Sequence, residues 1–437
     1  MESRRKIYGI FFTIFILAII LVLVINLIFI NKDRVPSKGV TRLYFADNMS
    51  EAHQIIIRKF NARYTGEIEI IPIDLPFSKF TTNERKELLA RSLRSRGSRI
   101  DIFAVDQIWV PRFTKWCEPL SRYFMQTHLN HILPQALSTC YYNNMLVGLP
   151  LYIDIGVMYY RSDILAQLHE TELQQSIETG VTWEELFAFG DRHPDIRPLY
   201  VIQGDDYEGL VCNYIEILKG MGGSIIDDGQ LVINTVQGRQ ATKFLYDLIF
   251  RYNYMPVETA GFNERISYFY ALDKDAPFFR GWSSFLKDMA IPNADSVKVK
   301  YLCAAMPPYF KGYSPATLFG GWNLMVSRYS KNKVAAMKFL EYTISDEVQE
   351  ILFETSGYLP ISEDIYKDPK ILQKYPYIIQ LKAMMEHGTH RPMLSDYTKI
   401  SDILSLYLNK VLKNEVSAEE ALEKTEEQIR KRQFLMD

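Results

Sequence analysis

Apolar residues recur at two spacings along the chain from residue 40 onward, and these spacings predict strands and helices in turn. Runs of alternating or continuous apolar residues predict strands at 42–46, 68–73 and 100–105. Apolar residues three and four positions apart predict helices at 50–64 and 83–97. Strands separated by helices in this way predict an α/β fold whose sheet contains parallel pairs.

The same alternation returns further along the chain and predicts a second α/β lobe. Strands are expected at 199–202 and 297–306, and a helix between them at 210–221. Two pairs of residues have the spacing of a capping box that opens a helix, Thr182 with Glu185 and Ser417 with Glu420. Further helices are expected to start at Thr235, Ser330 and Ser345.

Residues 7–30 form the longest apolar run and are numerous enough to cross a bilayer as one helix. Arg4, Arg5 and Lys6 precede the run, which favours a cytoplasmic N-terminus at 1–6 and a body outside the cytoplasm. A cleaved signal peptide is the alternative, but the run is longer than a usual signal core and no A-x-A sequence ends it. We therefore expect an uncleaved transmembrane signal anchor, followed by a short tether at 31–39.

Charge and cysteine spacing argue against several kinds of site. The formal net charge is −2 and no long basic run follows the N-terminus, which argues against nucleic acid as a partner. The four cysteines are widely scattered, so they predict neither a zinc site nor a disulfide framework, although a single bridge stays open. His387 and His390 are three residues apart, but Gly388 between them indicates a loop rather than a metal site. We expect no metal and no cofactor.

Sequence motifs of catalysis are absent. The chain has no GxSxG, no HExxH, no GxxxxGK[ST] and no GxGxxG after a predicted strand. Two of its many carboxylates could still meet in the fold as a glycosidase pair, so a carbohydrate-active enzyme stays as an alternative. Binding without turnover is the simpler hypothesis, and we do not expect an enzyme.

The most informative stretch is 142–161, which is predicted to be two extended runs with a break at Gly148 and Pro150. Tyr152 and Asp154 lie two residues apart, so in a strand both side chains leave the same face. An aromatic ring can cover the C–H face of a sugar, and a carboxylate can accept from neighbouring hydroxyl groups. The alternative is a half-buried strand that ends at the aspartate.

Other polar and aromatic residues stand at predicted strand ends and in loops. Ligands of parallel α/β sheets bind beyond the carboxyl ends of the strands, which points to Asp106, although this residue could also simply cap the helix that follows it. Paired glycines before Trp322 allow close approach of the backbone. Together these residues suit a cleft that binds a neutral polar molecule: Gln203, Tyr207, Glu208, Trp282, Trp322 and Arg391.

Several segments, in this order, resemble the extracellular solute-binding proteins of carbohydrate ABC importers, the group that includes maltose- and trehalose-binding proteins. The resemblance covers nearly everything from residue 42 onward. It rests on the segments 100–109 (IDIFAVDQIW), 142–161, 203–210 (QGDDYEGL), 280–282 (RGW), 320–324 (GGWNL), 359–361 (LPI) and 391–392 (RP). Two departures stand out: Gly281 replaces an asparagine that is common in the family, and the lipid-attachment cysteine of many relatives is missing.

The resemblance implies a bilobal periplasmic-binding-protein fold, with two α/β lobes that close on the ligand about a hinge. Lobe one is then expected at 40–151 and again at 318–356. Lobe two is expected at 152–317 and again at 357–437. The crossings between the lobes would lie near Tyr152 and Asp154 and near Gly320, Gly321 and Trp322.

The resemblance also implies roles for single residues. Asp106 and Asp154 would accept from sugar hydroxyl groups, and Arg391 would donate to them. Tyr152, Trp282 and Trp322 would stack on pyranose faces, with Gly320 and Gly321 leaving room beside them. Gln203, Tyr207 and Glu208 match a family segment and would either contact the ligand or brace the lobe. Glu51 and Arg85 stand where contacts from lobe one often occur in the family.

The sequence therefore predicts a membrane-anchored protein that binds a di- or oligosaccharide outside the cytoplasm, in the periplasm or at the cell exterior. Its partners would be the permease subunits of an ABC importer, which work with a cytoplasmic ATPase. A sensor that works with a membrane kinase or chemoreceptor is the alternative. The short stretch 1–6 cannot hold a signalling domain, so a sensor would need a partner chain.

Overall fold

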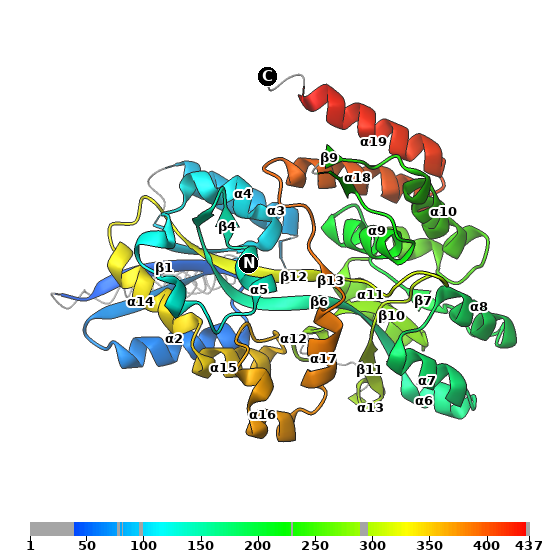
Figure 1. Ribbon diagram of the computed structural model, residues 1–437, viewed down its shortest axis with the longest axis horizontal. Coiled ribbons are helices and arrows are strands. Elements are labelled where there is room, and N and C mark those ends of the chain that lie inside the picture. The colour runs from blue at the N-terminus through cyan, green and yellow to red at the C-terminus, as the bar shows by residue number, and fades with distance from the viewer. Residues whose placement is uncertain are drawn as a thin grey trace, which may run out of the picture.

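A mixed sheet runs through the middle of the molecule and links its two sides (Figure 1). The structure is a computed structural model that describes residues 39–76, 79–80, 82–95, 99–228, 230–288 and 296–433. The strand order is β2–β1–β3–β12–β6–β10–β7, with β11 beside β6 and β13 beside β12. The strands are β1 Thr41–Asp47, β2 Ile68–Asp74, β3 Ile102–Asp106, β6 Leu149–Arg161, β7 Tyr200–Val201, β10 Phe278–Trp282, β11 Leu302–Ala305, β12 Thr317–Val326 and β13 Gly388–Thr389.

The first lobe is built on β1, β2 and β3, in which β1 pairs in parallel with both neighbours. These strands end at Asp47, Asp74 and Asp106, so three carboxylates stand at one edge of the sheet. Phe60 of α2 and Phe339 of α14 meet edge to face at 5.0 Å and close the core beside β1. The helices of this lobe, on the left of Figure 1, are α2 Glu51–Arg63, α3 Thr82–Arg94, α4 Val110–Phe113, α5 Pro134–Ser138, α14 Lys333–Thr343 and α15 Asp346–Ser356.

The second lobe is built on β10, β7 and β11. β10 pairs in parallel with β7, and both β10 and β11 pair antiparallel with β6. Its helices, on the right of Figure 1, are α6 Ser162–Gln167, α7 Thr171–Thr179, α8 Trp183–Arg192, α9 Glu208–Gly220, α10 Val236–Phe250, α11 Glu264–Asp273, α12 Phe285–Asp288, α13 Ser296–Val299, α18 Tyr397–Leu412 and α19 Ala418–Gln433. Two short hairpins complete the described strands, β4 Tyr141–Tyr142 with β5 Met145–Leu146 and β8 Ile226–Asp227 with β9 Gln230–Leu231.

Strand β6 belongs to both lobes, and all 13 of its residues are buried. Its first part pairs with β12, which pairs in turn with β3 of the first lobe. Its last part pairs with β10 and β11 of the second lobe. A third segment, 386–396, passes between the lobes beside the start of β12, after α16 Pro369–Lys374 and α17 Ile378–Met385 (Figure 1). The three passages are therefore adjacent.

Strand β12 is irregular where it enters the first lobe. The register with β6 shifts between Trp322 and Asn323, which marks a β-bulge. Gly321, just before the bulge, has a φ of +133°, in the region that favours glycine. A Cβ atom at this position would lie 2.6 Å from the backbone oxygen of Tyr152 on β6. Only glycine fits here.

The predicted α/β class is confirmed, and most predicted elements are present with small changes in their ends. Ser50 caps α2 by accepting from the backbone N–H of His53, and the Thr182–Glu185 capping box opens α8. The strand predicted at 297–306 is wrong in its first part, because 296–299 form the short helix α13 and only 302–305 form a strand. Pro150 lies inside β6 and does not break it.

The predicted anchor at 7–30, the cytoplasmic stretch at 1–6 and nearly all of the tether at 31–39 lie outside the described residues. Among the described helices, none is long and apolar enough to cross a membrane.

We expect Gly321→Ala to lower the free energy of unfolding by about 1–3 kcal/mol, because the new methyl group meets both an unfavourable φ and the backbone of β6. Urea denaturation measures the change. Gly312→Ala is the matched control, since Gly312 also has a positive φ, of +91°, but has no atom within 4 Å of the added carbon. Equal losses for the two variants would mean that the contact with β6 is unimportant.

Candidate functional site

Five of the predicted site residues lie on two neighbouring strands where the lobes meet. In the antiparallel ladder between β6 and β12, Tyr152 pairs with Trp322 and Asp154 pairs with Gly320, while Gly321 pairs with Ile153. Directly paired residues share a face of the sheet, and so do residues two apart. The two aromatic rings and the carboxylate are therefore on one face.

Trp322 is 8% exposed and lies between a cation and another aromatic ring. The guanidinium of Arg85, from α3, stands 4.3 Å from the centre of the Trp322 ring, and Trp109 meets that ring edge to face at 5.3 Å. Burial lowers the pKa of Arg85, and Asp47 at the end of β1 opposes this effect through an ion pair of 3.0 Å. His53 approaches the second oxygen of Asp47 at 3.1 Å. The carboxyl end of β1 thus holds a cation against Trp322.

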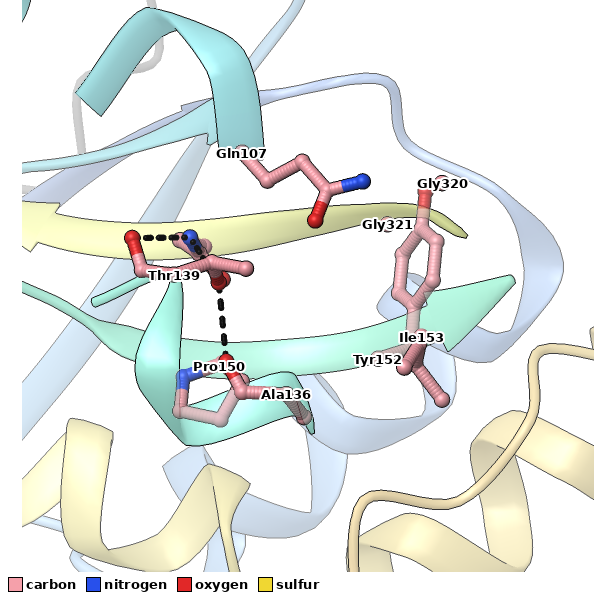
Figure 2. A pocket seen from close by; sticks show the side chains of 9 residues that line it. Gln107, Ala136, Thr139, Pro150, Tyr152, Ile153, Gly320 and Gly321 are labelled. Atoms are coloured by element: carbon pink, nitrogen blue, oxygen red, sulfur yellow. Dashed lines mark hydrogen bonds between the residues drawn. The ribbon is translucent and has the colours of Figure 1, made fainter. Parts of the chain in front are cut away.

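Tyr152 stacks on Tyr358, with ring centres 3.9 Å apart and planes tilted by 6°. Its ring points from β6 toward Gly320 of β12 (Figure 2). A narrow crevice lies beside the ring, and it has no room for a water molecule. It is lined by Gln107, Ala136, Thr139, Pro150, Tyr152, Ile153, Gly320, Gly321 and Asn323. One face of Tyr152 is thus covered, which the stretch 142–161 alone does not indicate.

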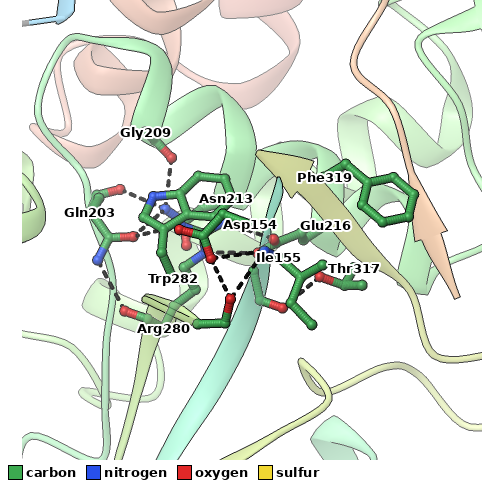
Figure 3. Close-up of polar contacts among 12 residues, drawn as sticks. Asp154, Ile155, Gln203, Gly209, Asn213, Glu216, Arg280, Trp282, Thr317 and Phe319 are labelled. Atoms are coloured by element: carbon green, nitrogen blue, oxygen red, sulfur yellow. Dashed lines mark hydrogen bonds and ion pairs between the residues drawn. The ribbon is translucent and has the colours of Figure 1, made fainter. Parts of the chain in front are cut away.

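Asp154 is held by hydrogen bonds from the loop after β10 (Figure 3). Its carboxylate accepts from the Ser284 hydroxyl at 2.6 Å and from the backbone N–H of Ile155 at 3.0 Å, and also from the Ser283 hydroxyl. Burial raises the pKa of Asp154 to about 6, although these donors favour the ionised form. Asp154 therefore ties β6 to the β10 loop.

Trp282 is the last residue of β10 and reaches across to β12. A Cβ atom at Gly320 would lie 2.8 Å from the Trp282 ring, so the indole lies directly against the backbone of β12. The guanidinium of Arg280 stands 4.0 Å from the centre of the same ring. Gly281 packs so closely on Tyr159 that a Cβ atom would lie 2.7 Å from that ring.

Arg391, in the third passage, links the two lobes. It is 2% exposed and donates to Asp106 of the first lobe at 2.9 Å and to Glu208 of the second lobe at 3.0 Å. Asp106 also caps the short helix η1 Gln107–Trp109 by accepting from the backbone N–H of Ile108. It therefore caps a helix and pairs with Arg391 at the end of β3 at the same time. Burial opposes the charge of Arg391, but the neighbouring carboxylates raise its pKa well above the ordinary value.

Gln203 and Tyr207 lie deeper. The amide of Gln203 is fully buried, donates to Ser267 and to the backbone oxygen of Arg280, and accepts from Asn213 at 3.2 Å. Tyr207 precedes α9, and its ring folds back over Gly209 so closely that no side chain fits there. Both residues brace the second lobe behind the site.

The predicted residues thus fall into three groups. One group meets at the passages between the lobes, where its members contact one another or their immediate neighbours: Tyr152, Trp282, Trp322, Asp106 and Arg391. Asp154 forms the second group and joins β6 to the β10 loop. Gln203 and Tyr207 lie behind the site. Glu51 is exposed at the start of α2. Among the described residues, no three His, Cys, Asp or Glu side chains gather as metal ligands, and the four cysteines are free thiols.

Sequence reasoning missed three partners of the site: Tyr358, the pair Ser283 and Ser284, and Glu216. Glu216 had a usable signal, because it is a carboxylate in a mostly apolar helical segment, and such groups are rarely buried without a partner. Tyr358 and the two serines follow ordinary turn sequences and carry no comparable signal.

Comparison with known proteins gives a consistent result. The family of bacterial extracellular solute-binding proteins matches residues 56–378 of this chain. A probable ABC transporter-binding protein of Deinococcus radiodurans is 26% identical over 354 residues, covering 80% of this chain and 83% of that protein. An arabinooligosaccharide-binding protein of Halalkalibacterium halodurans is 20% identical over 410 residues, covering 90% and 89%. The maltose-bound MalE3 of T. maritima superimposes with a TM-score of 0.79 and 25% identity, over 90% of this chain and 99% of that one.

We expect the stabilising contribution of Asp154, measured against Asp154→Asn, to fall by about 2–3 kcal/mol between pH 4 and pH 7. The raised pKa means that the folded protein favours the protonated carboxyl, so the contribution is full below the unfolded pKa and is lost as the pH rises through about 6. Urea denaturation at several pH values measures it.

Asp163→Asn is the control for this pH series. The ion pair of Asp163 with Arg161 outweighs its partial burial and lowers its pKa, so its contribution is present at pH 7 and falls on acidification. Parallel curves for the two variants would contradict the account of Asp154.

Proposed function

Because the chain belongs to the bacterial extracellular solute-binding proteins, we propose that it captures a neutral di- or oligosaccharide outside the cytoplasm and delivers it to the permease of an ABC importer. This family consists of binding proteins of ABC transporters and is non-enzymatic, so no catalytic role is assigned to the carboxylates of the site. The chain has the α/β periplasmic-binding-protein fold. The sugar, the residues that bind it and the membrane anchor are the proposed parts.

The observation that carries the proposal is the meeting of aromatic rings and charged groups at the passages between the lobes. Trp322 and Tyr152 share a face of the sheet, Trp282 reaches the same place from the second lobe, and Asp106 and Arg391 meet beside them. Rings of this kind cover the apolar faces of a pyranose, while carboxylate and guanidinium groups hydrogen-bond its hydroxyls.

The charges around the site favour an uncharged ligand. Each nearby arginine already has a carboxylate partner: Arg85 has Asp47, Arg280 has Glu216, and Arg391 has Asp106 and Glu208. The charges of these three arginines are therefore already balanced, and none of the three is left to balance an acidic sugar. The Nε–H of Arg391 has no acceptor within the described part of the chain, so it can donate to a sugar hydroxyl.

Closure would couple binding to transport. Trp322 and Asp106 belong to the first lobe and Trp282 to the second, so a sugar held by all three favours the state in which the lobes are together. The lobes would comprise 40–151 with 318–385, and 152–317 with 397–437, with the third passage at 386–396 between them. The bounds expected from the sequence give 357–385 to lobe two, but the backbone N–H of Leu133 donates to Ile361 and Lys374 pairs with Glu354 of α15. A ligand that contacts both lobes binds the closed state more tightly than the open state. A permease can then recognise the closed state.

The membrane anchor is proposed from the sequence. Residues 7–30 would hold the protein at the outer side of the cell membrane, which compensates for the missing lipid-attachment cysteine. Co-purification from solubilised membranes distinguishes the importer from the sensor alternative. The importer hypothesis expects permease and ATPase subunits, whereas a kinase or chemoreceptor in their place would contradict it.

We expect calorimetric titration of the full chain with neutral mono- to tetrasaccharides to give binding heat for at least one of them. Trp322→Phe should weaken that binding by about 1–2 kcal/mol, because the smaller ring covers less of the sugar. The detergent must have a polyoxyethylene head group, since a maltoside would compete for the site.

Trp183→Phe is the matched control for this titration. Trp183 is buried like Trp322, but it lies in the second lobe and packs on Tyr200 and Phe244 away from the passages. The affinity of the Trp183→Phe variant for the sugar should therefore equal that of the wild type. A folded wild-type chain without heat for any sugar would contradict the proposed function.

A further inference from the structure

Helix α9 is almost wholly buried yet carries two carboxylates, Glu208 and Glu216. An ionised group in the interior is costly unless it has a partner of opposite charge and further hydrogen bonds. Each of the two carboxylates has an arginine partner, and each arginine reaches a residue proposed to bind sugar. The sequence assigns Glu208 no definite role and does not single out Glu216.

Glu208, the first residue of α9, holds Arg391 in place. It accepts from the Arg391 guanidinium at 3.0 Å, from the Tyr397 hydroxyl at 3.2 Å and from the Ser401 hydroxyl. The second terminal nitrogen of Arg391 is thereby directed to Asp106 at 2.9 Å. Tyr397 and Ser401 belong to α18, so Glu208 joins α9, α18 and the third passage. Its position at the start of a helix also suits a negative charge.

Glu216, two turns further along α9, holds Arg280 (Figure 3). Arg280 donates to both carboxylate oxygens, at 2.8 and 3.0 Å, which is the bidentate geometry of a strong ion pair. A Cβ atom at Gly156 would collide with both partners, so β6 passes directly over the pair. The guanidinium plane then supports Trp282 at 4.0 Å, and the same indole lies against Gly320.

We propose that Glu208 and Glu216 are positioning residues that set sugar affinity without touching the sugar, Glu208 through Arg391 and Glu216 through Arg280 and Trp282. Helix α9 then acts as the support of the second-lobe half of the site. A guanidinium held at fixed direction loses little freedom on binding, and the same holds for an indole whose plane is fixed. The inference rests on the proposed function for its affinity readout, but not for its spectroscopic one.

A double-mutant cycle on sugar affinity tests Glu208. Glu208→Gln keeps the size and hydrogen-bonding capacity of the side chain but removes its charge, and we expect about tenfold weaker binding of the sugar that gives the largest heat. In the Arg391→Met background the same change should have no further effect, because the partner it acts through is gone. Ser401→Ala, which removes one donor to Glu208, should give a smaller loss of the same kind. If Glu208→Gln lowers the affinity by the same factor in the wild-type and the Arg391→Met chains, the proposal is overturned.

A spectrum recorded without sugar tests Glu216. The chain has five tryptophans, so a proton–nitrogen correlation spectrum shows five indole signals, and Trp282→Phe identifies the one of interest. Glu216→Gln should shift the Trp282 signal, whereas Glu208→Gln should leave it in place. An unmoved signal in Glu216→Gln would overturn the role of this residue.

Glu170→Gln is the control for both experiments. Glu170 is also a little-exposed carboxylate of the second lobe and pairs with Arg192 and His193, but it lies outside the site. It should change neither the affinity nor the Trp282 signal. If the wild-type chain binds no sugar at all, the proposed function fails, and the indole signal still decides whether α9 positions Trp282.

Discussion

The antiparallel ladder between β6 and β12 is the constraint on which the rest of the structure depends. It places Tyr152 opposite Trp322 and Asp154 opposite Gly320. Backbone hydrogen bonds of a buried ladder are costly to break, because both partners would be left without water or protein to bond to. The second lobe is joined to the same strand through β10 and β11. The spacing of the site is therefore set by one strand that both lobes share.

Buried ion pairs fix the orientation of the arginine side chains around this ladder. Arg85, Arg280 and Arg391 are each nearly inaccessible to solvent and each meets at least one carboxylate. Such pairs add little net stability, because the cost of removing both charges from water offsets their attraction. Removing one partner is expensive, since it leaves an unpaired charge inside the protein. The pairs are therefore better explained as devices that fix side chains of the site than as sources of stability.

Much of the fold could be predicted because local sequence patterns determine it. The spacing of apolar residues identified β1, β2 and β3, and the side chains of Ser50, Thr182 and Thr235 cap the helices they were expected to cap. The misjudged stretch at 297–306 alternates like a strand in sequence, but its first residues form a helical turn. A short alternating pattern cannot distinguish these two outcomes, because neighbours distant in the chain decide between them.

The site could be predicted only in part, for the same reason. Tyr152 and Asp154 were assigned to one face from their spacing alone, and the ladder confirms a shared strand. Their actual partners, Tyr358 for the ring and Ser283 and Ser284 for the carboxylate, come from segments more than a hundred residues away. Nothing in the local sequence of those segments indicates the contact. The positions of the glycines are explained only by what lies above them, as with Gly320 under Trp282.

The most direct measurement of the central claim is a crystal structure of the protein grown with the neutral sugar that it binds most tightly. The account predicts the sugar between the lobes, with a ring face against Trp322 or Trp282 and hydroxyl groups within hydrogen-bonding distance of Asp106 and Arg391. A sugar bound elsewhere on the molecule, with these four side chains arranged as they are here, would contradict it.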